Sequence, residues 1–185
     1  MASVVEIANQ ALLRVGDEPI ISLGDANERG RAVNASWPFV RREVLRAHPW
    51  NIAVVRIKLA ALADAPSWGF ATAYEIPAES LQVLEVDTVQ DWRVEGREIR
   101  TDATGELSIR YTKDETDSEV YDGILTECMV IRLAAEIAER LTNSRSKREL
   151  LLAEYEDKIQ EARMADGEEG SPSEFEEDAW VTVRH

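Results

Sequence analysis

The segment that decides the fold is residues 117–142, DSEVYDGILTECMVIRLAAEIAERLT. Apolar residues recur in it at helical spacing and form one long stripe, namely Val120, Ile124, Leu125, Cys128, Ile131, Ala135, Ala138 and Leu141. This spacing predicts a helix that is capped at its start by Asp117 or Ser118 and broken by the sequence TNS at 142–144. A helix with so long an apolar stripe needs other helices to cover it.

Two further helices are predicted near the ends of the chain. The pair Ser3 and Glu6 forms a capping-box pattern in front of an apolar stripe and predicts a helix over about 4–15. Ser146 and Glu149 repeat the capping pattern and predict a last helix that runs to about residue 165. These two helices belong to the predicted bundle, whose first and last helix pairs each bury an apolar stripe.

A fourth helix is predicted in the first third of the chain. It begins near Asp25, with Glu28 as its capping partner. Pro38 lies inside it and should kink it, because proline removes one backbone hydrogen bond. The helix ends at His48-Pro49, since the residue before a proline disfavours helical backbone angles.

Between these helices the apolar pattern changes to a period of two, which is typical of strands. Alternation of Ala53, Val55, Ile57 and Leu59 predicts the first strand. Short strands follow in FATAYEIP, LQVLEVDTV, DWRVEG, REIRTD and ELSIRYT, with turns at 95–97 and 103–105. We interpret these strands as a meander of about four to six strands.

The predicted fold class is therefore α+β: a four-helix bundle with an inserted antiparallel β lobe and an extended C-terminal arm. Residues 1–50 and 116–165 form the helical bundle, and residues 51–115 form the β lobe. From residue 166 to residue 185 the composition becomes rich in acid, glycine and serine. Such a segment buries too little apolar surface to fold alone, so it is interpreted as an acidic arm.

Charge excludes several classes of partner. The chain carries 36 acidic against 21 basic residues, a formal net charge of −15. This balance argues against a general nucleic-acid binder or a protein that docks on anionic lipid. No signal peptide or membrane span is seen, and Cys128 is the single cysteine, so we expect a soluble protein that is cytoplasmic when made.

Few residues support catalysis or metal binding. The chain contains two histidines, His48 and His185, and neither is expected to serve as a catalytic base. His48 is instead expected to donate to the last carbonyls of its helix. No paired cysteine or histidine ligands and no phosphate-binding glycine loop occur, so no catalytic residue, metal or cofactor is predicted. Cys128 lies on the apolar stripe and is expected to pack in the core.

Two surfaces suggest contacts with other proteins. Arg140, Arg145, Lys147 and Arg148 cluster between the last two helices, where they either compensate a helix dipole or bind an acidic partner. In the arm, Trp180, Val181, Thr182 and Val183 alternate in type behind an acidic tether, with Phe175 as a second anchor. We favour addition of this segment to a partner's sheet edge. The alternative is that it folds back onto the chain's own β lobe.

Several linked segments between residues 4 and 165 resemble the head-to-tail adaptor family of tailed bacteriophages. They are ALLRVGDEPIISL at 11–23, WPFVRREVLRAHPWNIAVVRIKLA at 37–60, AYEIPAESLQVLEV at 73–86, VEGREIRTD at 94–102, and 107–142, which includes the stripe quoted above. That family includes the tail tubular protein A of short-tailed phages and connectors of prophages and gene transfer agents. The arm matches no part of this pattern.

The resemblance implies a structural role without cofactor or catalysis. Such adaptors form a ring of about twelve copies through side-to-side contacts. The ring joins the portal protein to the downstream tail or stopper protein, and DNA passes through the lumen without specific binding. We therefore expect a virion protein of the head-to-tail interface that assembles in the host cytoplasm and binds no membrane.

Matching positions have structural roles under this resemblance. Gly16 and Pro19 shape the first turn, and Arg41 lies with its neighbour Arg42 on the second helix. Pro49 and Trp50 form a structural corner where the indole covers the bundle end. The arm, above all residues 180–183, is expected to contact the portal, so deletion of 167–185 should abolish docking. Acidic residues lining the lumen would repel DNA phosphates.

Two other functions are kept as alternatives. One is a stopper or tail-completion protein with similar helices, which would touch the tail rather than the portal. The other is a small hydrolase that uses buried carboxylates, for which a deep pocket with two convergent acids would be the sign.

Overall fold

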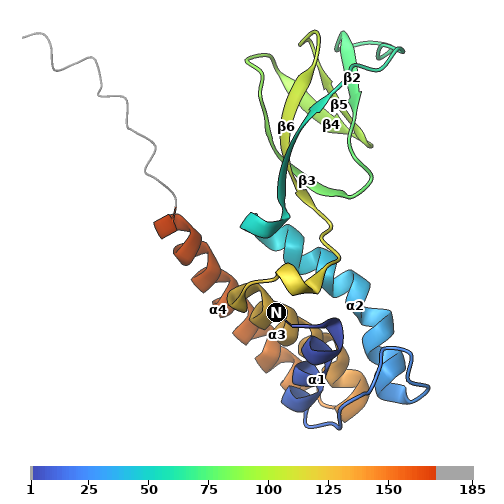
Figure 1. The fold of residues 1–185 in the computed structure, drawn as a ribbon, viewed down its shortest axis with the longest axis vertical. Helices are drawn as coiled ribbons and strands as arrows, with labels where there is room; N and C mark the ends of the chain where they lie inside the picture. The colour runs from blue at the N-terminus through green and yellow to red at the C-terminus, as the bar shows by residue number, and fades with distance from the viewer. Residues whose placement is uncertain (1, 170–185) are drawn as a thin grey trace, which may run out of the picture.

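The computed structural model describes residues 2–169 and shows an α+β protein that is elongated, with helices at one end and strands at the other (Figure 1). The described residues form four α-helices and two small antiparallel sheets. The helices are α1 (Val4–Val15), α2 (Glu28–Ala47), α3 (Gly123–Thr142) and α4 (Arg145–Glu169). The strands are β1 (Val54–Leu59), β2 (Thr72–Glu75), β3 (Ser80–Val86), β4 (Trp92–Glu95), β5 (Glu98–Thr101) and β6 (Leu107–Lys113).

The first helix is confirmed together with its capping box. The Ser3 hydroxyl accepts the amide of Glu6, and the Glu6 carboxylate accepts the amide of Ser3 at 2.6 Å. Gly16 ends α1 with a φ of 81°, in the left-handed region that glycine adopts without strain.

The predicted start of the second helix at Asp25 is wrong. The helix starts at Glu28, where the Asn27 side chain accepts the amide of Gly30 at 2.7 Å. Asp25 is already used in the preceding loop, because its carboxylate accepts the amide of Ile21 at 3.0 Å. An acid that closes a loop in this way is not free to cap a helix.

The starts of the last two helices also lie at other residues than predicted. Asp117 caps only a short 3₁₀ turn at Ser118–Val120, and Asp122 caps α3 by accepting the amide of Leu125 at 2.7 Å. The α4 start is capped by Ser144, which accepts the amide of Lys147, and not by Ser146. At its other end α4 continues to Glu169, past the predicted end at about 165.

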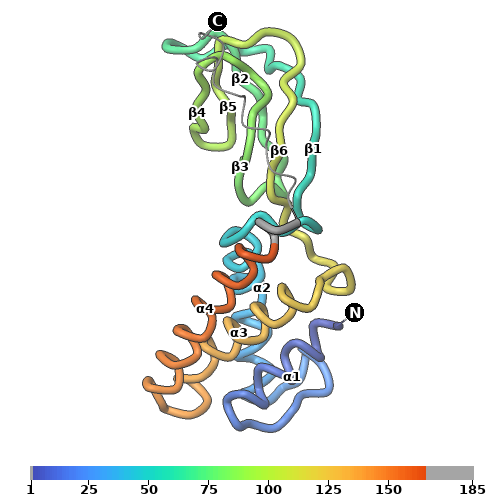
Figure 2. Tube along the Cα trace, turned by 90° about the vertical axis from the view of Figure 1, so that its left-hand side faces the viewer, coloured from blue at the N-terminus to red at the C-terminus, as the bar shows by residue number. Residues whose placement is uncertain are grey.

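The main core lies between the helices, and α3 is at its centre. Helix α3 contacts α1, α2 and α4, which lie beside it in Figure 2. These contacts bury most of the stripe predicted for it. Val120 is an exception, because it lies in the 3₁₀ turn before α3 and is 46% exposed. Its fully buried side chains include Leu125, Cys128, Met129, Leu133 and Ile137. No helix among the described residues is long and apolar enough to cross a membrane.

The strands do not form the predicted meander. The orders are β1-β6-β3 in one sheet and β2-β5-β4 in the other, so the last strand returns to lie between the first and the third. Their register places the apolar residues Val55, Ile57 and Leu59 of β1 opposite Tyr111, Ile109 and Leu107 of β6. Each apolar side chain thus finds a cross-strand apolar partner, which a pairing of β1 with β2 does not offer.

Candidate protein-interaction site

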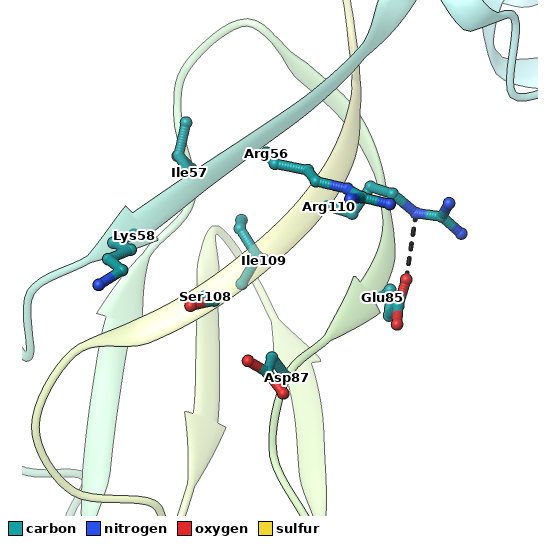
Figure 3. Close-up of a pocket in the computed structure, with 8 residues that line it drawn as sticks. All are labelled: Arg56, Ile57, Lys58, Glu85, Asp87, Ser108, Ile109 and Arg110. Atoms are coloured by element: carbon teal, nitrogen blue, oxygen red, sulfur yellow. Dashed lines mark ion pairs between the residues drawn. The ribbon is translucent and has the colours of Figure 1, made fainter.

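The outer face of the sheet β1-β6-β3 carries a cluster of charged side chains (Figure 3). It holds a shallow depression of about 500 Å³. The polar residues that line it are Arg56 and Lys58 on β1, Ser108 and Arg110 on β6, and Glu85 and Asp87 from β3 and the residue after it. Three cations thus meet two acids on a face of an otherwise acidic chain.

Arg56 and Arg110 lie directly opposite each other in the register of β1 and β6. Like charges in this position repel each other and destabilise the pair of strands. Glu85 reduces the repulsion through an ion pair with the Nε atom of Arg110 at 3.2 Å, drawn as the dashed line in Figure 3. Lys58 forms a second, longer pair with Glu106 at 3.4 Å. Counted with Glu106, three acids balance the three cations, so this face carries no net positive charge.

The depression does not bring together the groups of a hydrolase. His48, the histidine within the described residues, does not line the depression with Ser108 but contacts Trp50 with ring centroids 4.8 Å apart. Glu85 is exposed and paired with Arg110. Among the described residues no group of three or more potential metal ligands occurs.

A second polar cluster joins the helices to the strands. Arg41 on α2 donates from Nε and Nη2 to the two carboxylate oxygens of Asp114 at 2.8 and 2.9 Å. Arg42 donates to the same carboxylate at 2.9 Å. The side chains of Arg41 and Asp114 are only 11% and 13% exposed, so this bidentate pair is well shielded from water.

Charge and burial compete at Asp114. Burial by itself would raise the pKa of this carboxyl, but hydrogen bonds from Arg41 and Arg42 outweigh it, and the pKa lies below its ordinary value near 3.8. The hydrogen bonds between Arg41 and Asp114 also raise the pKa of the Arg41 guanidinium. Tyr121 closes the cluster with its hydroxyl, which donates to the carbonyl of Glu115 at 2.7 Å.

Sequence reasoning missed this cluster. Arg41 was assigned only to its helix, and Asp114 was given no role. The two residues are 73 positions apart, and no motif links them. The one signal in the sequence is the pair of adjacent arginines, Arg41 and Arg42, near the end of the second helix.

The corner residues Pro49 and Trp50 lie between α2 and β1. Trp50 is buried, and its indole Nε1 donates to the carbonyl of Val44 at 2.9 Å. This bond satisfies one of the carbonyls that the end of α2 leaves without a helical partner. The corner therefore fixes the direction in which β1 leaves the helices.

The basic cluster is partly used within the chain. Lys147 donates to the carbonyl of Val15 at 2.7 Å and so caps the end of α1 rather than α3. Arg145 pairs with Glu149 at 3.3 Å on its own helix, and Arg140 approaches Glu28 at 3.7 Å. The ion pairs of Arg145 and Arg140 are exposed and contribute little to the free energy of unfolding.

Cys128 is fully buried in the helical core, as predicted. Burial raises the pKa of its thiol to about 12, so the reactive thiolate is scarce at neutral pH.

We expect a thiol reagent at pH 8 to label Cys128 of the native chain at a small fraction of the rate seen in denaturant. Mass spectrometry of timed samples measures this, and equal rates would contradict the assigned burial.

The predicted partner residues Phe175, Trp180, Val181, Thr182 and Val183 lie outside the described part of the chain. Comparison with models of known protein families finds no match, and no curated protein matches the sequence.

Proposed function

We propose that this chain is a non-catalytic head-to-tail adaptor of a phage-like particle, which forms a ring between the portal protein and the next tail component. The resemblance of the linked segments between residues 4 and 165 supports this role. In it, the four helices serve as a bundle that makes the ring contacts, and residues 51–115 serve as an inserted β lobe that faces the tail-side neighbour. DNA passes through the ring lumen without specific binding.

The observation that carries the proposal is the presence of exposed apolar residues in loops at both ends of a long subunit. The loop between α1 and α2 and the loop after β1 lie at opposite ends of the long axis (Figure 1). Ile21 in the first is 92% exposed, and Trp68 in the second is 85% exposed. A tryptophan is seldom left so exposed unless a partner covers it. A subunit with such residues at both ends is suited to join two neighbours.

The net charge of −15 also fits a ring through which DNA moves. Carboxylates that face a channel repel phosphates and keep DNA from adhering to the wall. A mapped lumen that is strongly basic would contradict this part of the proposal.

Docking on the portal through the C-terminal arm gives the direct test. Because α4 continues to Glu169, the deletion is best placed at residues 170–185, which leaves the helix whole. We expect the full chain, mixed with the portal protein of the same particle, to give stacked rings in electron micrographs, and the deleted chain to give none. Substitution Val89→Ser, at a fully exposed position between β3 and β4 in the lobe assigned to the tail-side neighbour, serves as a control that should still dock.

Unchanged docking by the deleted chain would contradict the role of the arm. Binding of the full chain to the tail component alone, without the portal, would instead indicate a stopper or tail-completion protein.

A further inference from the structure

A groove separates the two sheets on the side where β3 and β4 form their edges. It measures about 820 Å³ and is lined by Arg46, Ile76, Ser80, Leu81, Gln82, Val83 and residues 92–97. Among the described strands, none pairs with the outer edge of β3 or with that of β4. Two strand edges that pair with no other described strand therefore border one groove.

The apolar wall of the groove is an extension of the β core. Trp92 and Val94 are the cross-strand partners of Thr101 and Ile99, which are both fully buried. Cross-strand partners share one face of a sheet, so Trp92 and Val94 continue the buried face to the edge of the sheet. There they stay 38% and 46% exposed. On the opposite side of the groove, Val83 of β3 packs against the same core.

The rim of the groove is basic, in contrast to the chain as a whole. Three arginines and one glutamate, Glu95, line it. Arg46 donates to the carbonyl of Leu81 at 2.6 Å, and Arg97 donates to that of Ile76 at 3.3 Å, so both are held in place. Arg93, the third, has no ion-pair partner within residues 2–165. This composition suits an extended peptide that is acidic and carries alternating apolar residues.

We propose that this groove is the docking site for the chain's own C-terminal arm, residues 174–183. Their sequence, EFEEDAWVTV, has four acids with Phe175 among them, followed by five residues of which Thr182 alone is polar. As an added strand, this segment would pair with a free sheet edge through its main chain. Trp180 would then cover the apolar wall, and the acids would face the arginines of the rim.

Helix α4 passes near the residues that line the groove. Arg163 on α4 donates to the carbonyl of Ala47 at 3.3 Å. Arg46, the residue before Ala47, lines the groove. Trp180 follows Glu169 by eleven residues, and an extended chain of that length reaches about 36 Å. The arm can therefore reach the groove of its own subunit, and tethering favours this site over that of a second copy.

The inference goes beyond the adaptor role and does not depend on it. It assigns the arm a place in the free subunit, where it shields two strand edges from unwanted pairing. In an adaptor, docking on the portal would then require the arm to leave this groove.

Hydrogen exchange and peptide binding test the proposal without a portal. Both buried clusters lie within residues 2–162, so a chain ending at Glu169 retains them. We expect amides of β3 and β4 to exchange more slowly in the full chain than in the shortened one. A labelled peptide of residues 170–185, added to the shortened chain, should bind and restore the slow exchange.

Arg93→Glu in the shortened chain should weaken peptide binding by about tenfold, because it replaces an attraction by a repulsion. Arg56→Glu makes the same charge change on β1, outside the groove, and should leave binding unchanged. Equal exchange in the full and shortened chains would overturn the proposal. Protection that grows with protein concentration would also overturn it, since a second copy would then be the occupant.

Discussion

Replacement of Asp114 by alanine is expected to lower the free energy of unfolding by about 2–3 kcal/mol. The carboxylate accepts three charge-assisted hydrogen bonds, two from Arg41 and one from Arg42. Its removal leaves the guanidinium of Arg41 shielded from water without its partner. Urea unfolding followed by circular dichroism measures the change.

Arg42→Ala is the matched control for this prediction. Arg42 makes one bond to the same carboxylate but is half exposed, so its loss should cost less than about 1 kcal/mol. A double-mutant cycle of Arg41→Ala and Asp114→Ala isolates the coupling of the buried pair. A coupling energy near zero would show that the pair does not stabilise the junction.

The junction also predicts a dependence on pH. The pKa of Asp114 is lower in the folded protein than in the unfolded chain, so ionisation favours the folded state. This contribution is fully present above the ordinary pKa near 3.8 and is lost as the pH falls through the lowered folded value. The Asp114→Asn chain should lack this part of the acid destabilisation.

Leu133→Ala in α3 is expected to have the largest effect on stability, about 3–4 kcal/mol. Leu133 is fully buried in the helical core, where α3 contacts the other three helices. The substitution removes apolar contacts and leaves a cavity that surrounding helices cannot easily close. Thermal and urea unfolding report the loss.

Leu150→Ala removes the same atoms at an exposed position of α4 and should change stability by less than about 0.5 kcal/mol. Similar losses for Leu133→Ala and Leu150→Ala would contradict the central position of α3 in the core.

Predictions from local sequence patterns were accurate where an element buries one side and has capping or stop residues at its ends. The first helix was predicted with its capping box and its stop at Gly16, and all six strands lie within or beside the predicted segments. Helix starts were less accurate, because several polar residues stood near each start. Asp25 and Asn27 were both suitable caps, and a loop contact decided between them.

Which segments become helices and strands, which faces they bury, and how acidic the whole chain is can all be derived from the amino-acid sequence. These properties follow from the spacing of apolar residues along a few turns or one strand. Only the tertiary structure decided that β6 lies between β1 and β3, that Arg41 meets Asp114, and that β3 and β4 border one basic groove. Those contacts join residues far apart in the chain, and their energies depend on a register and a burial that exist only after folding.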